Sequence, residues 1–175
     1  MGYVSGMGSC LSAITLMAVA AVTCSCERQS DTQTRVQGAK VVGLEDKVYE
    51  IGETAGSRHF SLTVKNLRVC APEPHLQPPA GVTTLGVQVE IIGNSALEVP
   101  ANVFYAHLIT ETGTRFESTL AGCKPVLSAR RLGQGDSARG WISFHVPDKY
   151  RRFEFLYQPV VIGATRQQTK FRLEL

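Results

Sequence analysis

The sequence predicts an all-β sandwich that follows an N-terminal signal segment. Residues 1–26 contain no charged side chain, whereas all the basic and acidic residues come after Cys26. Beyond residue 40, apolar residues recur with period two in short runs, which is typical of strands with one buried face. Turn residues (Gly, Pro and Asn) separate these runs at short intervals, a pattern that favours a sandwich, with a closed barrel as the alternative.

The N-terminal segment predicts export. Its apolar run, residues 11–22, has the length of a secretory signal and falls short of the roughly 20 residues that a membrane-crossing helix needs. We therefore expect a signal peptide over residues 1–26. An uncleaved signal anchor is the alternative, because residues 2–9 are also uncharged and would lengthen the helix.

Two cysteines at the end of the apolar run resemble the lipidation site of a bacterial lipobox. Cys26 follows the small residue Ser25, and Cys24 follows Thr23. We predict acylation at Cys26, with Cys24 as the alternative site and a soluble secreted protein as the outcome of ordinary cleavage. Acylation with more than one chain would hold the protein stably on the extracytoplasmic side of the membrane.

The rest of the chain divides into a tether and one domain. Residues 27–39 are polar and poor in apolar side chains, so we expect a flexible tether. Residues 40–175 are enough for one domain with a single core. Cys70 and Cys123 are the two cysteines of this domain, and in an oxidising compartment they predict a disulfide. The alternative is two separate buried thiols.

Six runs are predicted to form strands. In the first run the apolar phase changes after Val64, so a bulge near residues 65–66 is expected to keep Leu67 and Val69 inward. The run 103–109 is apolar on both phases, as in a central strand covered on both sides. Residues 72–81 contain four prolines and predict an exposed loop, a candidate binding edge. The predicted strands are 60–69, 85–92, 103–109, 141–146, 153–157 and 171–175.

Several of these segments together resemble a known family. Residues 81–94, Val99-Pro100 and residues 132–147 are similar to the immunoglobulin-like domain of unknown function found in bacterial lipoproteins, to which secreted mycobacterial antigens are similar in fold. The resemblance covers most of residues 49–175. It implies an immunoglobulin-like antiparallel β-sandwich and supplies no catalytic residues.

Charge is distributed unevenly along the domain. Residues 27–119 hold 8 basic and 11 acidic side chains, whereas residues 120–175 hold 10 and 4, which gives −3 and +6. One hypothesis is a basic face that meets anionic headgroups or an acidic envelope polymer. The alternative is a solvated face, in which the arginines pair with Asp136, Asp148 and Glu154. The candidate binding residues are Trp141, Arg130, Arg131, Arg139, Arg151 and Arg152.

Trp141 has two interpretations. It occupies the strand phase opposite Ile142 and Phe144, so it is a candidate for an exposed binding anchor. The alternative is that it packs at a sheet edge or beneath a loop, since large aromatic side chains are highly buried on average.

The sequence predicts no catalytic chemistry. His59, His75, His107 and His145 lack the spacing of a metal motif, and we expect no metal, cofactor or nucleic-acid partner. The predicted function is a non-catalytic interaction module at the bacterial cell envelope, with another envelope protein or polymer as partner. The alternatives are a small-ligand carrier of the same fold and a hydrolase-type enzyme with an unrecognised site.

Overall fold

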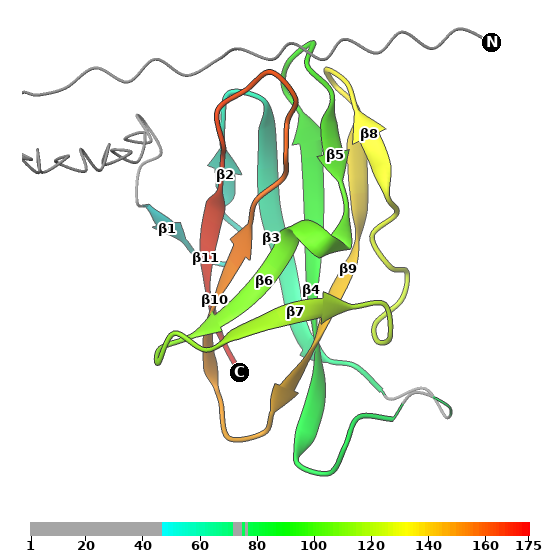
Figure 1. The fold of residues 1–175 in the computed structure, drawn as a ribbon, viewed down its shortest axis with the longest axis vertical. Helices are drawn as coiled ribbons and strands as arrows, with labels where there is room; N and C mark the ends of the chain where they lie inside the picture. The colour runs from blue at the N-terminus through cyan, green and yellow to red at the C-terminus, as the bar shows by residue number, and fades with distance from the viewer. Residues whose placement is uncertain (1–46, 72–74, 76) are drawn as a thin grey trace, which may run out of the picture. The chain divides into compact units, whose positions relative to one another are not determined.

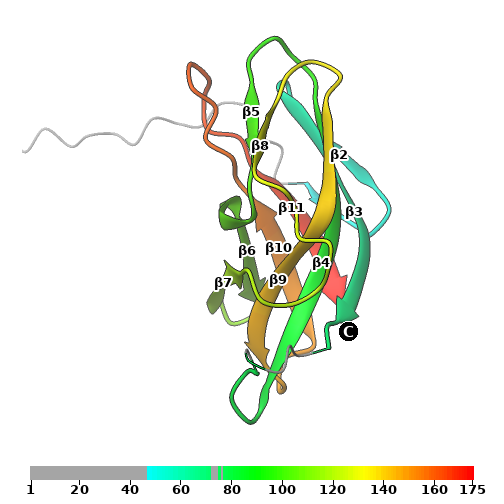
Figure 2. The ribbon, with the colours of Figure 1, turned by 90° about the vertical axis from the view of Figure 1, so that its right-hand side faces the viewer.

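The domain is a β-sandwich of two layers (Figures 1 and 2). The computed structural model describes residues 47–71, 75 and 77–175. The predicted signal peptide, the tether and both candidate lipidation cysteines lie outside the described residues, as do residues 72–74 and 76 of the proline-rich loop.

One layer is a five-stranded sheet in the order β1-β11-β10-β6-β7. Its neighbours pair antiparallel except β1 and β11, which run parallel. The fold is therefore the predicted all-β sandwich with one parallel pair at its edge. The strands are β1 (Val48–Tyr49), β6 (Ala106–Thr110), β7 (Arg115–Thr119), β10 (Arg152–Tyr157) and β11 (Thr169–Glu174).

The second layer has the order β9-β4-β3-β2 and is antiparallel throughout. The end of β7 also pairs with β9, which joins the two layers along one side. These strands are β2 (Thr54–Gly56), β3 (Phe60–Val69), β4 (Val82–Gly93) and β9 (Ser137–Pro147). A separate pair consists of β5 (Val99–Ala101) and β8 (Arg130–Leu132).

The core lies between the two layers and follows the predicted alternation. On β4, the four predicted inward residues, Leu85 to Ile91 in steps of two, are fully buried. Phe153, Phe155 and Tyr157 on β10 face them from the other layer and are buried too. The main cluster of buried side chains takes residues from both layers, the first being Ala55 on β2 and the last Leu173 on β11.

Two strands depart in part from the sequence prediction. A register shift between Val64 and Asn66 confirms the predicted bulge in β3. Leu67 packs partly against the core as expected, but Val69 is 58% exposed, so the prediction that it points inward is wrong. The strand therefore recovers its inward phase only at Leu67, although the partner of Val69 on β4, Leu85, is fully buried.

The run 103–109 is only partly a strand. Residues Val103–Tyr105 form a 3-10 turn, η1, because the Asn102 side chain accepts a hydrogen bond from the Phe104 amide and caps it. The strand β6 starts after this turn and lies inside its sheet between β10 and β7. His107 on its outer phase is buried, so this strand is covered on both sides at that point.

Candidate interaction surfaces

Trp141 lies in a small cluster that is separate from the main core. Its side chain is 4% exposed and packs with the Cys70–Cys123 disulfide. The connection from β7 to β8 covers it, because the Trp141 amide donates to Pro125 O and its carbonyl accepts from Leu127 N. The hypothesis of an exposed anchor at Trp141 is therefore wrong, and its alternative, burial beneath a loop, is what the structure has.

Close packing fixes this cluster on the outer face of β4. A Cβ at Gly86 would lie 2.6 Å from both disulfide sulfur atoms, so glycine is required here. The Arg68 guanidinium lies 4.3 Å from the Trp141 ring centre, and its Nε atom is 3.2 Å from Cys123 Sγ. An exposed arginine thus closes the cluster and leaves the indole no open face for a partner.

The five arginines of the predicted basic face do not form one surface. Arg130, Arg131 and Arg139 lie on β8 and at the start of β9, whereas Arg151 and Arg152 follow the end of β9. Most of β9 separates the two groups, a length of about 26 Å for eight residues. Figure 1 shows β8 near one end of the sandwich and the turn from β9 to β10 at the other.

The ion pairs of these arginines also differ from the expected ones. Arg131 pairs with Glu98 at 3.5 Å, and Arg152 pairs with Glu111 and Glu174 at 3.4 and 3.2 Å. The two aspartates proposed as partners bind elsewhere: Asp148 accepts from Thr83 and Asp136 from the Gly133 amide.

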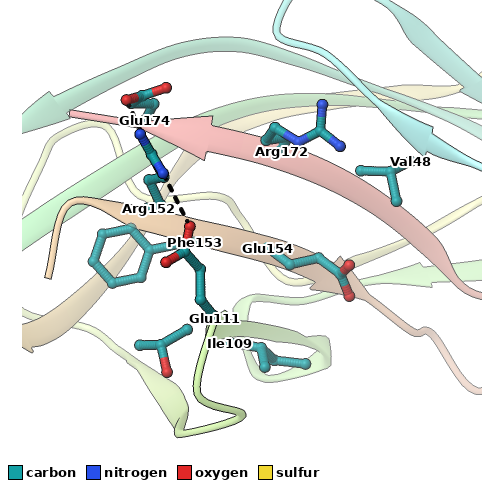
Figure 3. Close-up of a pocket in the computed structure, with 9 residues that line it drawn as sticks. Val48, Ile109, Glu111, Arg152, Phe153, Glu154, Arg172 and Glu174 are labelled. Carbon is teal, nitrogen blue, oxygen red and sulfur yellow. Dashed lines mark hydrogen bonds and ion pairs between the residues drawn. The ribbon is translucent and has the colours of Figure 1, made fainter.

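A shallow groove of about 530 Å³ crosses the outer face of the first sheet (Figure 3). Val48 and Ile109 supply apolar surface, and charged side chains from β10 and β11 stand beside them. The Arg152 guanidinium bridges Glu111 and Glu174, and these hydrogen bonds raise the pKa of Arg152. The groove is open to solvent and its central cation already has two carboxylate partners.

A different surface is strongly apolar. The connection from β10 to β11, residues 158–168, exposes two aliphatic side chains, Val160 at 67% and Ile162 at 77%. Ile162 lies in the turn from Val161 to Ala164, which is closed by a 3.2 Å hydrogen bond and has Gly163 at a φ of +82°. We call residues 158–168 the apolar loop.

The apolar loop is held in place from below. Val161 between the two exposed residues is buried in the main core. The Gln158 amide donates to Tyr105 O at 2.8 Å, and the Arg166 side chain donates to the Gln158 side chain. Phe104 of η1, next to this contact, is 59% exposed. The aliphatic side chains therefore project from an anchored segment.

The apolar loop shares one end of the sandwich with three other connections, as both views show (Figures 1 and 2). Hydrogen bonds link the other three connections to one another: Asn94 N donates to His59 O, and Gly135 N to Gly93 O. We call this end, formed by the apolar loop and the connections 57–59, 94–98 and 133–136, the loop end. Two of its exposed basic side chains, Arg58 and Arg166, have no carboxylate within ion-pair distance among the described residues.

The family comparison matches most of the domain described above. The model of the family described as "Domain of unknown function (DUF4352)" matches residues 49–167. The chain belongs to this family. The match confirms the resemblance drawn from residues 81–94 and 132–147. No curated protein matches the sequence.

Solved structures share the fold of this DUF4352 domain. The Bacillus subtilis protein ycdA, a "putative lipoprotein", has a TM-score of 0.60 and 14% identity over 69% of this chain and 38% of its own. The B. subtilis protein yjhA has a TM-score of 0.56 and 15% identity over 73% of this chain and all of its own. The secreted Mycobacterium tuberculosis protein MPT63 has a TM-score of 0.51 and 14% identity over 75% of this chain and all of its own. At these identities the comparison shows a shared fold, and this chain matches well under half the length of ycdA.

Histidines and other side chains able to bind metal are spread over the described part of the DUF4352 domain. Within residues 47–71, 75 and 77–175, no group of three or more His, Cys, Asp or Glu side chains is placed to hold a metal ion. The same part contains no helix long and apolar enough to cross a membrane. His59 bonds Ser95 at 2.9 Å and His107 contacts Glu117 and Arg115, so these two histidines lie in separate places.

Sequence reasoning missed the apolar loop of the DUF4352 domain. Residues 159–162, Pro-Val-Val-Ile, form an apolar run between the predicted strands 153–157 and 171–175. The sequence did indicate this surface, because a short apolar run inside a turn region has no paired strand to bury it and its side chains are expected to be exposed. A search for apolar residues that alternate with period two does not detect such a run.

Proposed function

We propose that this protein is an exported, lipid-anchored interaction module of the bacterial cell envelope that makes its contacts through the loop end. The observation that carries the proposal is the exposure of Val160 and Ile162 on an anchored loop. Exposed aliphatic side chains that gather on one segment mark a surface that is covered by a partner.

Three further features support the proposal. The N-terminal segment has the pattern of a signal followed by Cys26, and polar residues separate it from the domain. The disulfide suits an oxidising compartment outside the cytoplasm. The neighbours in fold include a secreted protein, MPT63, and a "putative lipoprotein", ycdA.

The groove of Figure 3 favours a second candidate function, an extracytoplasmic carrier of small ligands. Its volume of about 530 Å³ lies within the usual range of small-molecule sites, which is roughly 300 to 1,000 Å³. We rank it second because such sites enclose most of their ligand, whereas this groove is open and its arginine is already paired.

Photo-crosslinking in intact cells tests the proposal. A photoreactive residue at position 162 should crosslink to an envelope component, protein or lipid, because that side chain is exposed on the loop end. The same residue at position 69, also exposed but on β3, is the matched control. Crosslinking from position 154 in the groove to a small molecule, with none from 162, would instead favour the carrier.

A further inference from the structure

We infer that the loop end docks on an anionic lipid bilayer, with Val160 and Ile162 inserted among the acyl chains. The inference rests on the proposed function and names the partner class of the same surface. Three properties of the loop end carry it: the kind of apolar side chain, the charge beside it and the reach of the chain that precedes the domain.

The apolar side chains suit lipid better than protein. Protein interfaces depend on Trp, Tyr and Arg anchors seated in pockets, and Val and Leu are under-represented among them. The apolar loop offers two aliphatic side chains on either side of the buried Val161 and no aromatic residue of its own, although the exposed Phe104 of η1 lies next to its start. Aliphatic side chains gain free energy in a hydrocarbon layer without needing a shaped pocket.

The loop end offers basic side chains to phosphate headgroups, while its two carboxylates have partners within the protein: Glu98 pairs with Arg131, and Asp136 accepts from the Gly133 amide. Arg166 follows soon after the aliphatic tip, and Arg58 lies in another connection at the same end, the one from β2 to β3 (Figure 1). Neither has a carboxylate partner among the described residues. At the opposite end Arg152 pairs with Glu111 and Glu174, whereas Arg151 has no ion pair among the described residues either. A bilayer with anionic lipids attracts unpaired basic groups held at its surface.

The chain before the domain is long enough to allow this docking. If cleavage occurs at Cys26, residues 27–46 separate the acylated cysteine from Lys47. Fully extended, they span at most about 70 Å. The longest strand, β4 with 12 residues, is about 40 Å long, so residues 27–46 are long enough to let the loop end reach the bilayer that holds the anchor.

Co-sedimentation with vesicles tests the inference. The protein is a chain of residues 27–175, which contains the whole core described above and lacks the anchor. We expect it to bind vesicles of phosphatidylglycerol and phosphatidylcholine and to bind pure phosphatidylcholine much more weakly. The double variant Val160→Asp/Ile162→Asp should lose at least about tenfold in affinity. The control Val69→Asp/Leu120→Asp, which changes two exposed side chains elsewhere, should keep it.

A second pair of variants separates the charge from the apolar contact. Arg58→Gln/Arg166→Gln should weaken binding about fivefold for each arginine removed, and the control Arg151→Gln at the other end should not. Melting temperatures near that of the wild type will show that the variants are folded. No wild-type binding to anionic vesicles, or equal losses in the test and control variants, would overturn the inference. Crosslinking of position 162 to a protein would then leave the proposed function standing.

Discussion

Tyr157 at the end of β10 combines full burial with a polar hydroxyl. The hydroxyl donates to Pro100 O at 3.3 Å and accepts from the Asn102 amide at 3.2 Å. It thereby ties β10 to the segment between β5 and η1. Burial raises the pKa of Tyr157 well above its usual value of about 10, so the hydroxyl stays protonated in the folded state.

Removal of the Tyr157 hydroxyl should lower the stability of the fold without creating a cavity in the core. Tyr157→Phe keeps the ring and removes the partner of the half-buried Asn102 amide, so we expect a loss of about 1 kcal/mol in the free energy of unfolding. Urea denaturation measures it. Tyr105→Phe is the control, because the Tyr105 hydroxyl makes no hydrogen bond within the described residues. An equal loss in both variants would contradict this account.

His107 predicts a pH dependence of stability. Its Nε2 atom accepts from the Arg115 guanidinium at 2.6 Å, which places the proton of the neutral ring on Nδ1, 2.8 Å from Glu117. Burial lowers the pKa of His107 below about 6.5; Glu117 opposes this shift and Arg115 adds to it. The unfolded chain therefore takes up its proton first as the pH falls.

The expected result is a loss of stability as the pH falls below about 6.5. Unfolding in urea at pH 7.5 and at pH 5.5 gives the difference. His107→Gln should reduce the difference, whereas His75→Gln, at an exposed position, should leave it unchanged. An unchanged difference in His107→Gln would mean that other groups cause the pH dependence.

At the scale of single residues, the sequence predicted which face of a strand a side chain occupies but did not predict whether that side chain is covered. Trp141 does lie on the strand phase opposite Ile142, as predicted, yet the side chain is buried. The connection from β7 to β8 covers it on the outer face of the sheet. Strand periodicity reports only which face of the sheet a residue occupies. The contact with Arg68 comes from β3, far earlier in the chain, and no local pattern indicates it.

At the scale of elements, the disulfide fastens the connection from β7 to β8 onto the outer face of β4. It joins Cys70 after β3 to Cys123 over a separation of 53 residues. Cys70→Ser/Cys123→Ser should lower the free energy of unfolding by about 4 kcal/mol on the chain-entropy model. Gly86→Ala should be costly in the oxidised wild type, because its Cβ would lie 2.6 Å from both sulfur atoms.

A double-mutant cycle between these changes checks the packing. With both cysteines replaced by the smaller serine, Gly86→Ala should cost less than it does in the wild type. The same cost in both backgrounds would show that the disulfide does not set the requirement for glycine.

The six predicted strands fall on β3, β4, β6, β9, β10 and β11, and the longer ones were predictable because each buries one face; the shorter strands β1, β2, β5, β7 and β8 were not predicted. The alternation in β4 and β10 places every second residue in the core, and the phase change in β3 marks its bulge. Sequence could not predict the parallel pairing of β1 with β11, since so short a strand carries no period. The turn η1 was missed because its residues are as apolar as the strand directly after it, and only the capping residue before it, Asn102, indicates a turn.

At the scale of the whole molecule, the predicted anchor remains the main untested element. Intact mass of the protein extracted from membranes should give a mature chain that starts at an acylated Cys26. Cys26→Ser should move the protein to the soluble fraction of the envelope, and Cys24→Ser should not. The opposite result would move the anchor to Cys24, and no shift in either variant would favour an uncleaved signal anchor.

The interaction surface was the least predictable feature. The arginines are numerous in residues 120–175, but the fold sends them to both ends of the sandwich, so charge counted along the chain did not locate a surface. Which end of the sandwich exposes apolar side chains depends on which loops meet there. Strand pairings such as β3 with β4 and β10 with β11 bring those loops together.

Hydrogen exchange of the lipidated, mature protein in membranes tests the central claim most directly. Backbone amides of residues 158–166 should be protected in the membrane-bound protein relative to the same protein in detergent, while those lining the groove on β10 and β11 should exchange equally in both. Protection that is confined to the groove, or absent from residues 158–166, would contradict the claim that the loop end makes the contact.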